Sequence, residues 1–188
     1  MTTPVKVINR GLGKLSASTI SAIEPPRTGV ERFMADNYPG WRDSEIAKRR
    51  WRFALQRVKL TPTGDALTDD LKPYAFQLPP DCLRVIRKRG DRWEQRGTKL
   101  FHTETELTID YLRRVPEVEF DPMFAEVLAC RIAVESCEFV TQSTAKLADK
   151  RGEYKDAVGE AVRTNSFVTG PENLSEDDNE FSWVYERY

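Results

Sequence analysis

The chain has 188 residues, of which 39% are hydrophobic and 31% charged, so it can bury one core without disulfides or a metal. Its formal net charge of −1 provides no bulk attraction to nucleic acid or to an anionic membrane. No apolar run approaches the roughly 20 residues of a membrane-spanning helix, and the first residues lack the apolar stretch of a signal peptide. The odd number of cysteines, without metal-ligand spacing, predicts synthesis in a reducing cytoplasm and three small core residues, Cys82, Cys130 and Cys137.

The first third of the sequence has the spacing of helices. An initial helix is indicated by apolar residues at helical intervals, namely Val5, Ile8, Leu12 and Leu15. Thr28 and Glu31 have the spacing of a capping box, which predicts the start of a second helix that Pro39-Gly40 should break. A third helix is expected over residues 44–60, with an apolar stripe of Ala47, Trp51, Ala54, Leu55 and Val58.

The middle of the chain changes to the period of strands. The segments PYAFQLPPDCLRVIRKRGDRW and TKLFHTETELTIDYLRRV contain short β-rich runs, with alternation at Leu107, Ile109 and Tyr111. Two turns are expected, at Arg89-Gly90-Asp91 and at Gln95-Arg96-Gly97. These patterns predict three to five antiparallel strands with one face open to water.

The helical period returns after Pro116. Asp121-Pro122 suits a helix start, and the face that follows contains Phe124, Leu128, Ile132, Ser136 and Phe139. A further helix is expected over residues 143–163, with a face of Leu147, Tyr154, Val158 and Ala161. The order predicts an α+β protein: a mainly α-helical bundle of residues 1–60 and 117–165, an inserted small antiparallel β subdomain of residues 61–116, and a C-terminal arm of residues 166–188.

Few residues suggest catalysis or a bound cofactor. His102 is the only histidine and has no evident partner, GLGK at positions 11–14 lacks the spacing of a phosphate-binding loop, and the aspartates at 65, 69 and 70 suit a solvated turn. Glu135 lies beside the buried face of a helix, where a carboxylate could act as a general acid or pair with a neighbouring helix or subunit. We therefore expect no enzyme activity, no metal and no cofactor.

A basic stretch covers residues 41–60, which contain seven basic side chains and two acidic ones. On the expected third helix, four of the basic residues would lie opposite the apolar stripe: Lys48, Arg49, Arg52 and Lys59. Such a face could follow a phosphate backbone, contact an acidic partner or another subunit, or simply be solvated. Aromatic residues do not alternate with these charges, which favours a protein partner.

The last residues, LSEDDNEFSWVYERY, combine acids with aromatic rings. As a strand, Phe181, Trp183 and Tyr185 would share a face; as a helix, Phe181, Val184, Tyr185 and Tyr188 would. Burial of each ring stabilises by about 1.5–3 kcal/mol, so these rings should find an apolar surface. They could pack on their own domain or dock on another chain, and the polar stretch before them favours docking.

Three stretches resemble bacteriophage head-to-tail adaptor proteins, also called tail tubular protein A. In WRFALQRVKLTP, Trp51, Phe53, Ala54, Leu60 and Pro62 occupy the positions of the family's W-x-F-A and L-x-P elements. YAFQLPPDCLRVIR is similar to its Leu-Pro-x-Asp-Cys-Leu-Arg-Val strand through a run that includes Leu78, Pro79 and Asp81. IDYLRRVPEVEFDPMF is similar to its Tyr-x-x-Arg-Val strand and Phe-Asp-Pro-x-Phe helix, through residues that include Arg113 and Phe124.

The resemblance implies a structural virion protein at the head-tail junction. It implies an oligomeric ring, usually a dodecamer, between the portal protein and the tail or nozzle protein, with double-stranded DNA passing through the lumen during genome ejection. It also implies that the C-terminal segment reaches onto the portal. Two alternatives remain, a tail-associated peptidoglycan hydrolase that uses Glu135 and a DNA-binding structural protein that uses the basic stretch.

Overall fold

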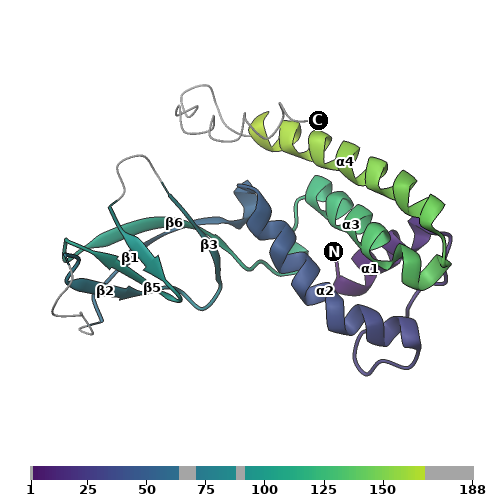
Figure 1. Ribbon diagram of the computed structural model, residues 1–188, viewed down its shortest axis with the longest axis horizontal. Helices are drawn as coiled ribbons and strands as arrows, with labels where there is room; N and C mark the ends of the chain where they lie inside the picture. Colours follow the sequence, from purple (N-terminus) through teal and green to yellow (C-terminus); the bar gives the residue numbers. More distant parts are fainter. Residues whose placement is uncertain (1, 64–70, 88–91, 168–188) are drawn as a thin grey trace. The chain divides into compact units, whose positions relative to one another are not determined.

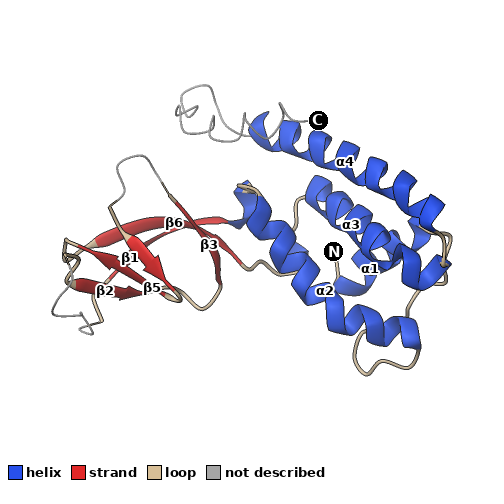
Figure 2. Ribbon diagram, in the orientation of Figure 1, coloured by secondary structure: helices blue, strands red, loops and turns tan. Residues whose placement is uncertain are grey.

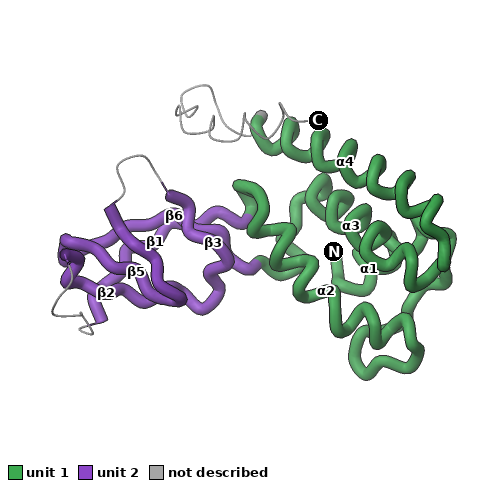
Figure 3. The backbone as a smooth tube through the Cα atoms, viewed as in Figure 1, with its two compact units in different colours: residues 1–53, 115–168 green, residues 54–114, 169–188 purple. Residues whose placement is uncertain are grey.

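The computed structural model describes residues 2–63, 71–87 and 92–167, and the described chain is an α+β protein (Figures 1 and 2). It divides into two compact units (Figure 3). One unit contains the chain up to Phe53 and again from Val115, and the other contains residues 54–114. The boundaries fall at residues 53 and 114, earlier than the predicted residues 60 and 116. The first boundary moves because residues 55–60 form a strand of the second unit and not the expected third helix. No helix among the described residues has the length and apolar character to cross a membrane.

The described part of the first unit contains four helices, α1 (Pro4–Lys14), α2 (Gly29–Lys48), α3 (Pro122–Thr141) and α4 (Thr144–Phe167), and a short 3-10 turn at Glu117–Glu119. A second 3-10 turn, Arg52–Ala54, spans the boundary to the second unit. Helix α3 packs against each of the other three (Figure 1). Its central place follows from its sequence, because buried residues occur on several sides of it. The helix starts as predicted: Asp121 accepts hydrogen bonds from the N–H groups of Met123 and Phe124, with Pro122 in the first turn.

Helix α2 begins with the predicted capping box but does not break at Pro39. Thr28 accepts from the Glu31 N–H, and Glu31 accepts from the Thr28 N–H. Backbone N–H donors from Arg27 and Ser21 lower the pKa of Glu31 to about 2. The predicted break is wrong because the buried face continues through Pro39 in the same register, with Met34 and Tyr38 before it and Glu45 and Ile46 after it. Packing of that face outweighs the roughly 3 kcal/mol that an interior proline costs.

The predicted third helix over residues 44–60 is also wrong. Helix α2 ends at Lys48, and Trp51 turns inward so that its Nε1 donates to the Glu45 carbonyl oxygen at 3.1 Å. Residues 55–60 form strand β1, which pairs with strand β6 along its whole length. The apolar residues at helical spacing belong to different elements, which include the end of α2 and strand β1. Residues 55–60 are a strand because they pair with β6.

The second unit contains six strands, arranged as two three-stranded antiparallel sheets. One sheet has the order β1 (Leu55–Leu60), β6 (Leu107–Arg113), β3 (Cys82–Ile86), and the other β2 (Tyr74–Gln77), β5 (Lys99–His102), β4 (Glu94–Arg96). Residues from both sheets share one hydrophobic core, which includes Phe76, Leu100 and Ile109. The predicted antiparallel strands are confirmed. The turn after β4 is confirmed at Gly97, which has a φ of +59° that favours glycine, whereas Arg89-Gly90-Asp91 lies outside the described residues.

Two glycines of α1 give a matched test of this packing. A Cβ at Gly11 would lie 2.8 Å from the Ala129 carbonyl oxygen and 2.8 Å from Ile132 Cγ2, whereas a Cβ at Gly13 would meet nothing within 4 Å. We expect Gly11→Ala to destabilise by about 1–3 kcal/mol through overpacking, and Gly13→Ala to stabilise by about 0.5–1 kcal/mol through helix propensity. Urea denaturation of both variants measures the difference, and equal effects at the two positions would contradict the close approach of α1 to α3.

Candidate functional site

A buried carboxylate lies where three helices of the first unit meet. Glu45 is on the same face of α2 as the buried residues Met34 and Tyr38, three and two helical turns earlier, so the helix carries it inward. Its side chain is 0% exposed. There it meets Arg131 of α3 and Tyr154 of α4. A single carboxylate therefore connects α2, α3 and α4.

Both carboxylate oxygens of Glu45 accept several hydrogen bonds. Oε1 accepts from Arg49 Nη1 at 2.8 Å and from the Tyr154 hydroxyl at 3.0 Å. Oε2 accepts from Lys48 Nζ at 3.1 Å, from Arg131 Nη1 at 2.9 Å and from the same hydroxyl at 2.8 Å. A buried charge with this many charge-assisted donors is satisfied rather than strained.

Electrostatics keep this carboxylate ionised. Burial alone would raise the pKa of Glu45, but Lys48, Tyr154 and Arg49 together outweigh burial and hold that pKa below its usual value of 4.5. The reciprocal effect appears at Tyr154, where burial and the nearby Glu45 charge raise the pKa to about 12. Glu45 accepts hydrogen bonds and has no proton to give near neutral pH. Its arrangement fits the fixing of three helices better than proton transfer.

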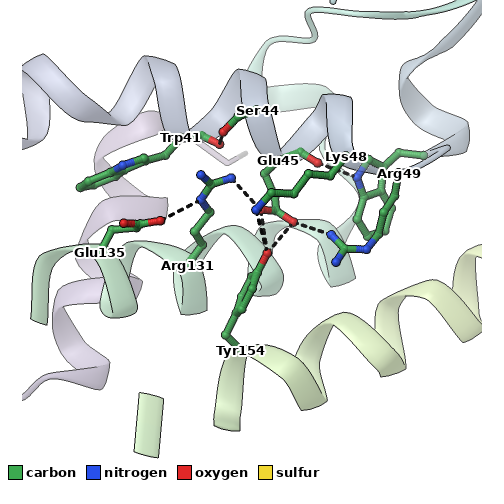
Figure 4. Close-up of polar contacts among 9 residues, drawn as sticks. Trp41, Ser44, Glu45, Lys48, Arg49, Arg131, Glu135 and Tyr154 are labelled. Carbon is green, nitrogen blue, oxygen red and sulfur yellow. Dashed lines mark hydrogen bonds and ion pairs between the residues drawn. The ribbon is translucent and has the colours of Figure 1, made fainter. Parts of the chain in front are cut away.

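Glu135 lies at the edge of this cluster. Its side chain is 43% exposed, and its Oε1 lies 3.6 Å from Arg131 Nε on the same helix (Figure 4). The general-acid hypothesis requires a buried Glu135 carboxyl group, and a side chain with this exposure does not meet that requirement. The alternative prediction was that Glu135 pairs with a charge on a neighbouring helix or subunit. Glu135 does pair with a charge, but its partner Arg131 lies on the same helix, four residues earlier.

The four residues expected to form a basic face do not share a helix. Lys48 ends α2, Arg49 is its C-terminal cap, Arg52 begins a 3-10 turn and Lys59 is on strand β1. The expectation of one face is wrong because the predicted third helix does not form: α2 ends at Lys48, and residues 55–60 form strand β1. Lys48 and Arg49 bind Glu45, and Lys59 pairs with Glu106 at 2.7 Å. Whether any of the four meets DNA or another subunit stays a prediction.

Four residues of the adaptor-like motifs, Trp51, Phe53, Phe120 and Phe124, meet in one aromatic cluster of the first unit. The Trp51 ring lies 5.1 Å from the Phe124 ring, and the Phe53 ring lies 4.8 Å from it. Phe120 joins at 4.9 Å from Phe124. Edge-to-face and tilted rings at these distances stabilise beyond their buried area. The motif residues before the β unit and those after it therefore belong to one packing arrangement.

Four other motif residues, Leu78, Pro79, Asp81 and Arg113, lie in the second unit. Leu78 is buried, the Pro79 carbonyl accepts from the Cys82 N–H at 3.0 Å, and Arg113 pairs with Cys82 in the sheet. Asp81 has two contacts with the last strand: its carboxylate accepts from the Tyr111 hydroxyl at 3.3 Å, and its carbonyl accepts from the Arg114 N–H at 2.7 Å. These residues join the start of β3 to the end of β6. A hollow of about 170 Å³ beside them is lined mainly by residues 77–84.

Other sequence predictions have mixed outcomes. The cysteines are free; Cys130 and Cys137 are buried, as expected of core residues, whereas Cys82 is half-buried and packs against the core of the second unit. His102 lies on β5, where its Nδ1 accepts from the Glu104 N–H at 3.0 Å. Over the described ranges, no group of three or more histidine, cysteine, aspartate or glutamate side chains could hold a metal. The aspartates at 65, 69 and 70 and the tail residues Phe181, Trp183, Val184, Tyr185 and Tyr188 lie outside those ranges.

One aromatic residue of α3, Phe139, is exposed although the sequence pattern predicts it on a buried face. Its exposed fraction is 50%. Its ring stacks on Phe33 of α2 at 4.2 Å with an interplanar angle of 7°, and Trp41 meets Phe33 edge-on at 5.8 Å. The prediction is wrong because the Phe139 ring packs on Phe33 of α2 with half of its surface open to solvent, whereas Ser136 and Cys137, one turn earlier or less, are fully buried. The result is an apolar area on the surface of the first unit.

Comparison with protein-family models and with curated proteins found no match for this chain.

Proposed function

We propose that this protein is a non-enzymatic head-to-tail adaptor, a ring-forming virion protein that joins a portal to a tail and lets DNA pass through its centre. The observation that carries the proposal is the aromatic cluster of Trp51, Phe53 and Phe124. These residues come from two of the three stretches that resemble the adaptor family, separated by the whole β unit. Their meeting supports the view that the resemblance reflects one shared packing arrangement.

Two further features support an assembly role. Glu45, the most deeply buried carboxylate described, joins α2 to Arg131 of α3 and to the Tyr154 hydroxyl of α4, which suits a rigid structural part. Phe139, which is 50% exposed and stacks on the half-buried Phe33, gives the helical unit an apolar surface position of the kind that protein contacts cover. In a ring, such an area would meet a different surface of the next subunit, because ring contacts are heterologous and close by rotation.

The aromatic end of the sequence, residues 181–188, is the part that we propose docks on the portal. The test mixes purified protein with portal rings of the same virion and measures co-sedimentation. The full chain should sediment with the rings, and deletion of residues 174–188 should abolish this. Replacing the aromatics Phe181, Trp183, Tyr185 and Tyr188 with serine should have the same effect as the deletion.

A matched control separates the contribution of the aromatic side chains to docking from the contribution of the acidic charges. Amide replacement of Glu176, Asp177, Asp178 and Glu180 leaves the aromatic residues in place and should keep co-sedimentation within about two-fold of the full chain. If the truncated chain still sediments with the rings, the docking role of the tail is wrong. If the full chain never does, the adaptor function itself is wrong.

A further inference from the structure

One surface of the first unit combines an exposed aromatic side chain with acidic ones. Phe33 covers one face of the Phe139 ring in the stacked contact at 4.2 Å, and half of Phe139 stays open to solvent. Glu135, one helical turn before Phe139, is 43% exposed, and the neighbouring Glu138 is exposed as well. We call Glu135, Glu138 and Phe139 the acidic–aromatic surface.

Helix α1 gives the same unit a surface of the opposite charge. The helix contains three basic residues and no acidic one. Two of them share one carboxylate of α3: Arg10 Nη1 lies 3.2 Å from Glu126 Oε2, and Lys14 pairs with the other oxygen. Two cations on one carboxylate leave an excess of positive charge, and the Arg10 side chain is 54% exposed in spite of its ion pair. We call Arg10 and Lys14 the α1 surface.

The two surfaces lie on opposite sides of helix α3. Glu126, to which the α1 surface is bound, and Glu135 are nine positions apart on this helix, which is two and a half turns. One copy of the chain can therefore meet the α1 surface of a second copy with its acidic–aromatic surface, while its own α1 surface stays open to a third. Head-to-tail contacts of this kind generate rings when the rotation between subunits closes.

Arginine is the side chain that an aromatic face beside a carboxylate fits best. Its planar guanidinium stacks on aromatic rings and also binds carboxylates. The second unit of this chain contains the combination: the Arg96 guanidinium lies 5.2 Å from the centre of the Phe101 ring, and Arg96 Nε lies 2.8 Å from Glu94 Oε1. Arg10 has the charge and the exposure to repeat this arrangement on the acidic–aromatic surface of a second copy.

We propose that a second copy of this chain docks its α1 surface on the acidic–aromatic surface, with Arg10 over the open face of the Phe139 ring and beside Glu138. The inference rests on the proposed function, because it names the two surfaces that join neighbouring subunits of the ring. It is separate from portal docking, which we assign to residues 181–188.

Exchange of charge between Arg10 and Glu138 tests this contact. Sedimentation velocity of the full chain at increasing concentration measures its self-association constant. Arg10→Glu and Glu138→Arg should each lower this constant about five- to ten-fold, because each variant brings like charges together. The double variant should return to within about two-fold of the wild-type constant, because opposite charges then face each other again. An equal mixture of the two single variants should do the same for the same reason. Such recovery also shows that the single variants are folded.

Arg151→Glu and Glu160→Arg are the matched controls, because each reverses one exposed charge on α4 and should leave the association constant unchanged. The proposal is overturned if only one of the two reversals weakens association, or if the double variant associates as weakly as the single variants. It is also overturned if the wild-type chain stays monomeric up to about 1 mM.

Co-sedimentation of the same samples with portal rings separates this contact from the proposed function. A wild-type chain that binds portal rings but gives any of the overturning results keeps the adaptor function and loses the contact between copies. A chain whose charge exchange behaves as expected, but which never binds portal rings, keeps the contact and loses the adaptor function.

Discussion

Replacement of Glu45 by glutamine should lower the free energy of unfolding by about 3–5 kcal/mol, the usual effect of removing one partner from a buried ionic cluster. The variant leaves Arg131, 12% exposed, beside a neutral amide, and it removes the charge that Lys48 and Arg49 also bind. Three helices lose their common connection at once. Urea denaturation of the wild-type chain and the variant measures this difference.

The matched control for this prediction is Glu135→Gln. Glu135 belongs to the same cluster but is 43% exposed and lies 3.6 Å from Arg131 Nε, so we expect a loss below about 1 kcal/mol. Replacing Glu45 and Arg131 together with methionine should recover part of the loss, because neither charge is then left without its partner. Similar losses for Glu45→Gln and Glu135→Gln would contradict the central role of Glu45.

The same cluster predicts a pH dependence. The pKa of Glu45 is lower in the folded chain than the usual value of 4.5, so folding favours the ionised form. Its contribution to stability is therefore fully present above pH 4.5 and is lost as the pH falls through the folded-state pKa. The stability difference between the wild-type chain and Glu45→Gln should accordingly be constant near neutral pH and shrink under acid conditions. Urea titrations at pH 7 and at several values below 4.5 measure it, and a difference that grows in acid would contradict this sign.

The second large effect is expected from Trp51→Ala, at about 3–5 kcal/mol of lost stability. Trp51 is 2% exposed, contacts the Phe124 ring and donates from Nε1 to the Glu45 carbonyl oxygen. Truncation opens a cavity between α2 and α3 and leaves that carbonyl without this donor. Trp51→Phe keeps most of the volume and loses only the hydrogen bond, so about 1–2 kcal/mol is expected.

Trp41→Ala is the matched control for tryptophan truncation. Trp41 is only half-buried and meets Phe33 edge-on near the surface, so its loss should cost clearly less than that of Trp51. The comparison is made by urea denaturation under the same conditions. Equal losses at the two positions would show that Trp51 does not have its proposed place in the core.

The sequence predicted the fold class and most elements because local signals and tertiary packing agree in them. The capping box at Thr28 and Glu31 and the start at Asp121-Pro122 both depend on neighbouring residues only, and both are correct. Pro39 shows the opposite case. Its local preference is overruled by a buried face that only the folded bundle reveals. Residues 55–60 are a strand because they pair with β6. The spacing of apolar residues within 55–60 carries no information about that distant partner.

The cluster around Glu45 was harder to predict than the elements that carry it. Tyr154 was assigned to an apolar face and Arg131 was not singled out, yet both bind the same carboxylate. One signal was present: Glu45 lies seven residues after Tyr38, on the inward face of α2. An acid at such a position calls for buried cations, but which cations provide the charge depends on how α3 and α4 pack. Periodicity within one helix does not contain that information.

The central claim is that the aromatic end of this chain docks on a foreign subunit in a head-to-tail junction. Electron cryomicroscopy of the full chain assembled with portal rings tests it most directly. The account predicts a ring of this protein under the portal, with density for residues 181–188 seated on portal subunits. A ring whose residues 181–188 fold against their own helices, or portal particles that carry no ring, would contradict it.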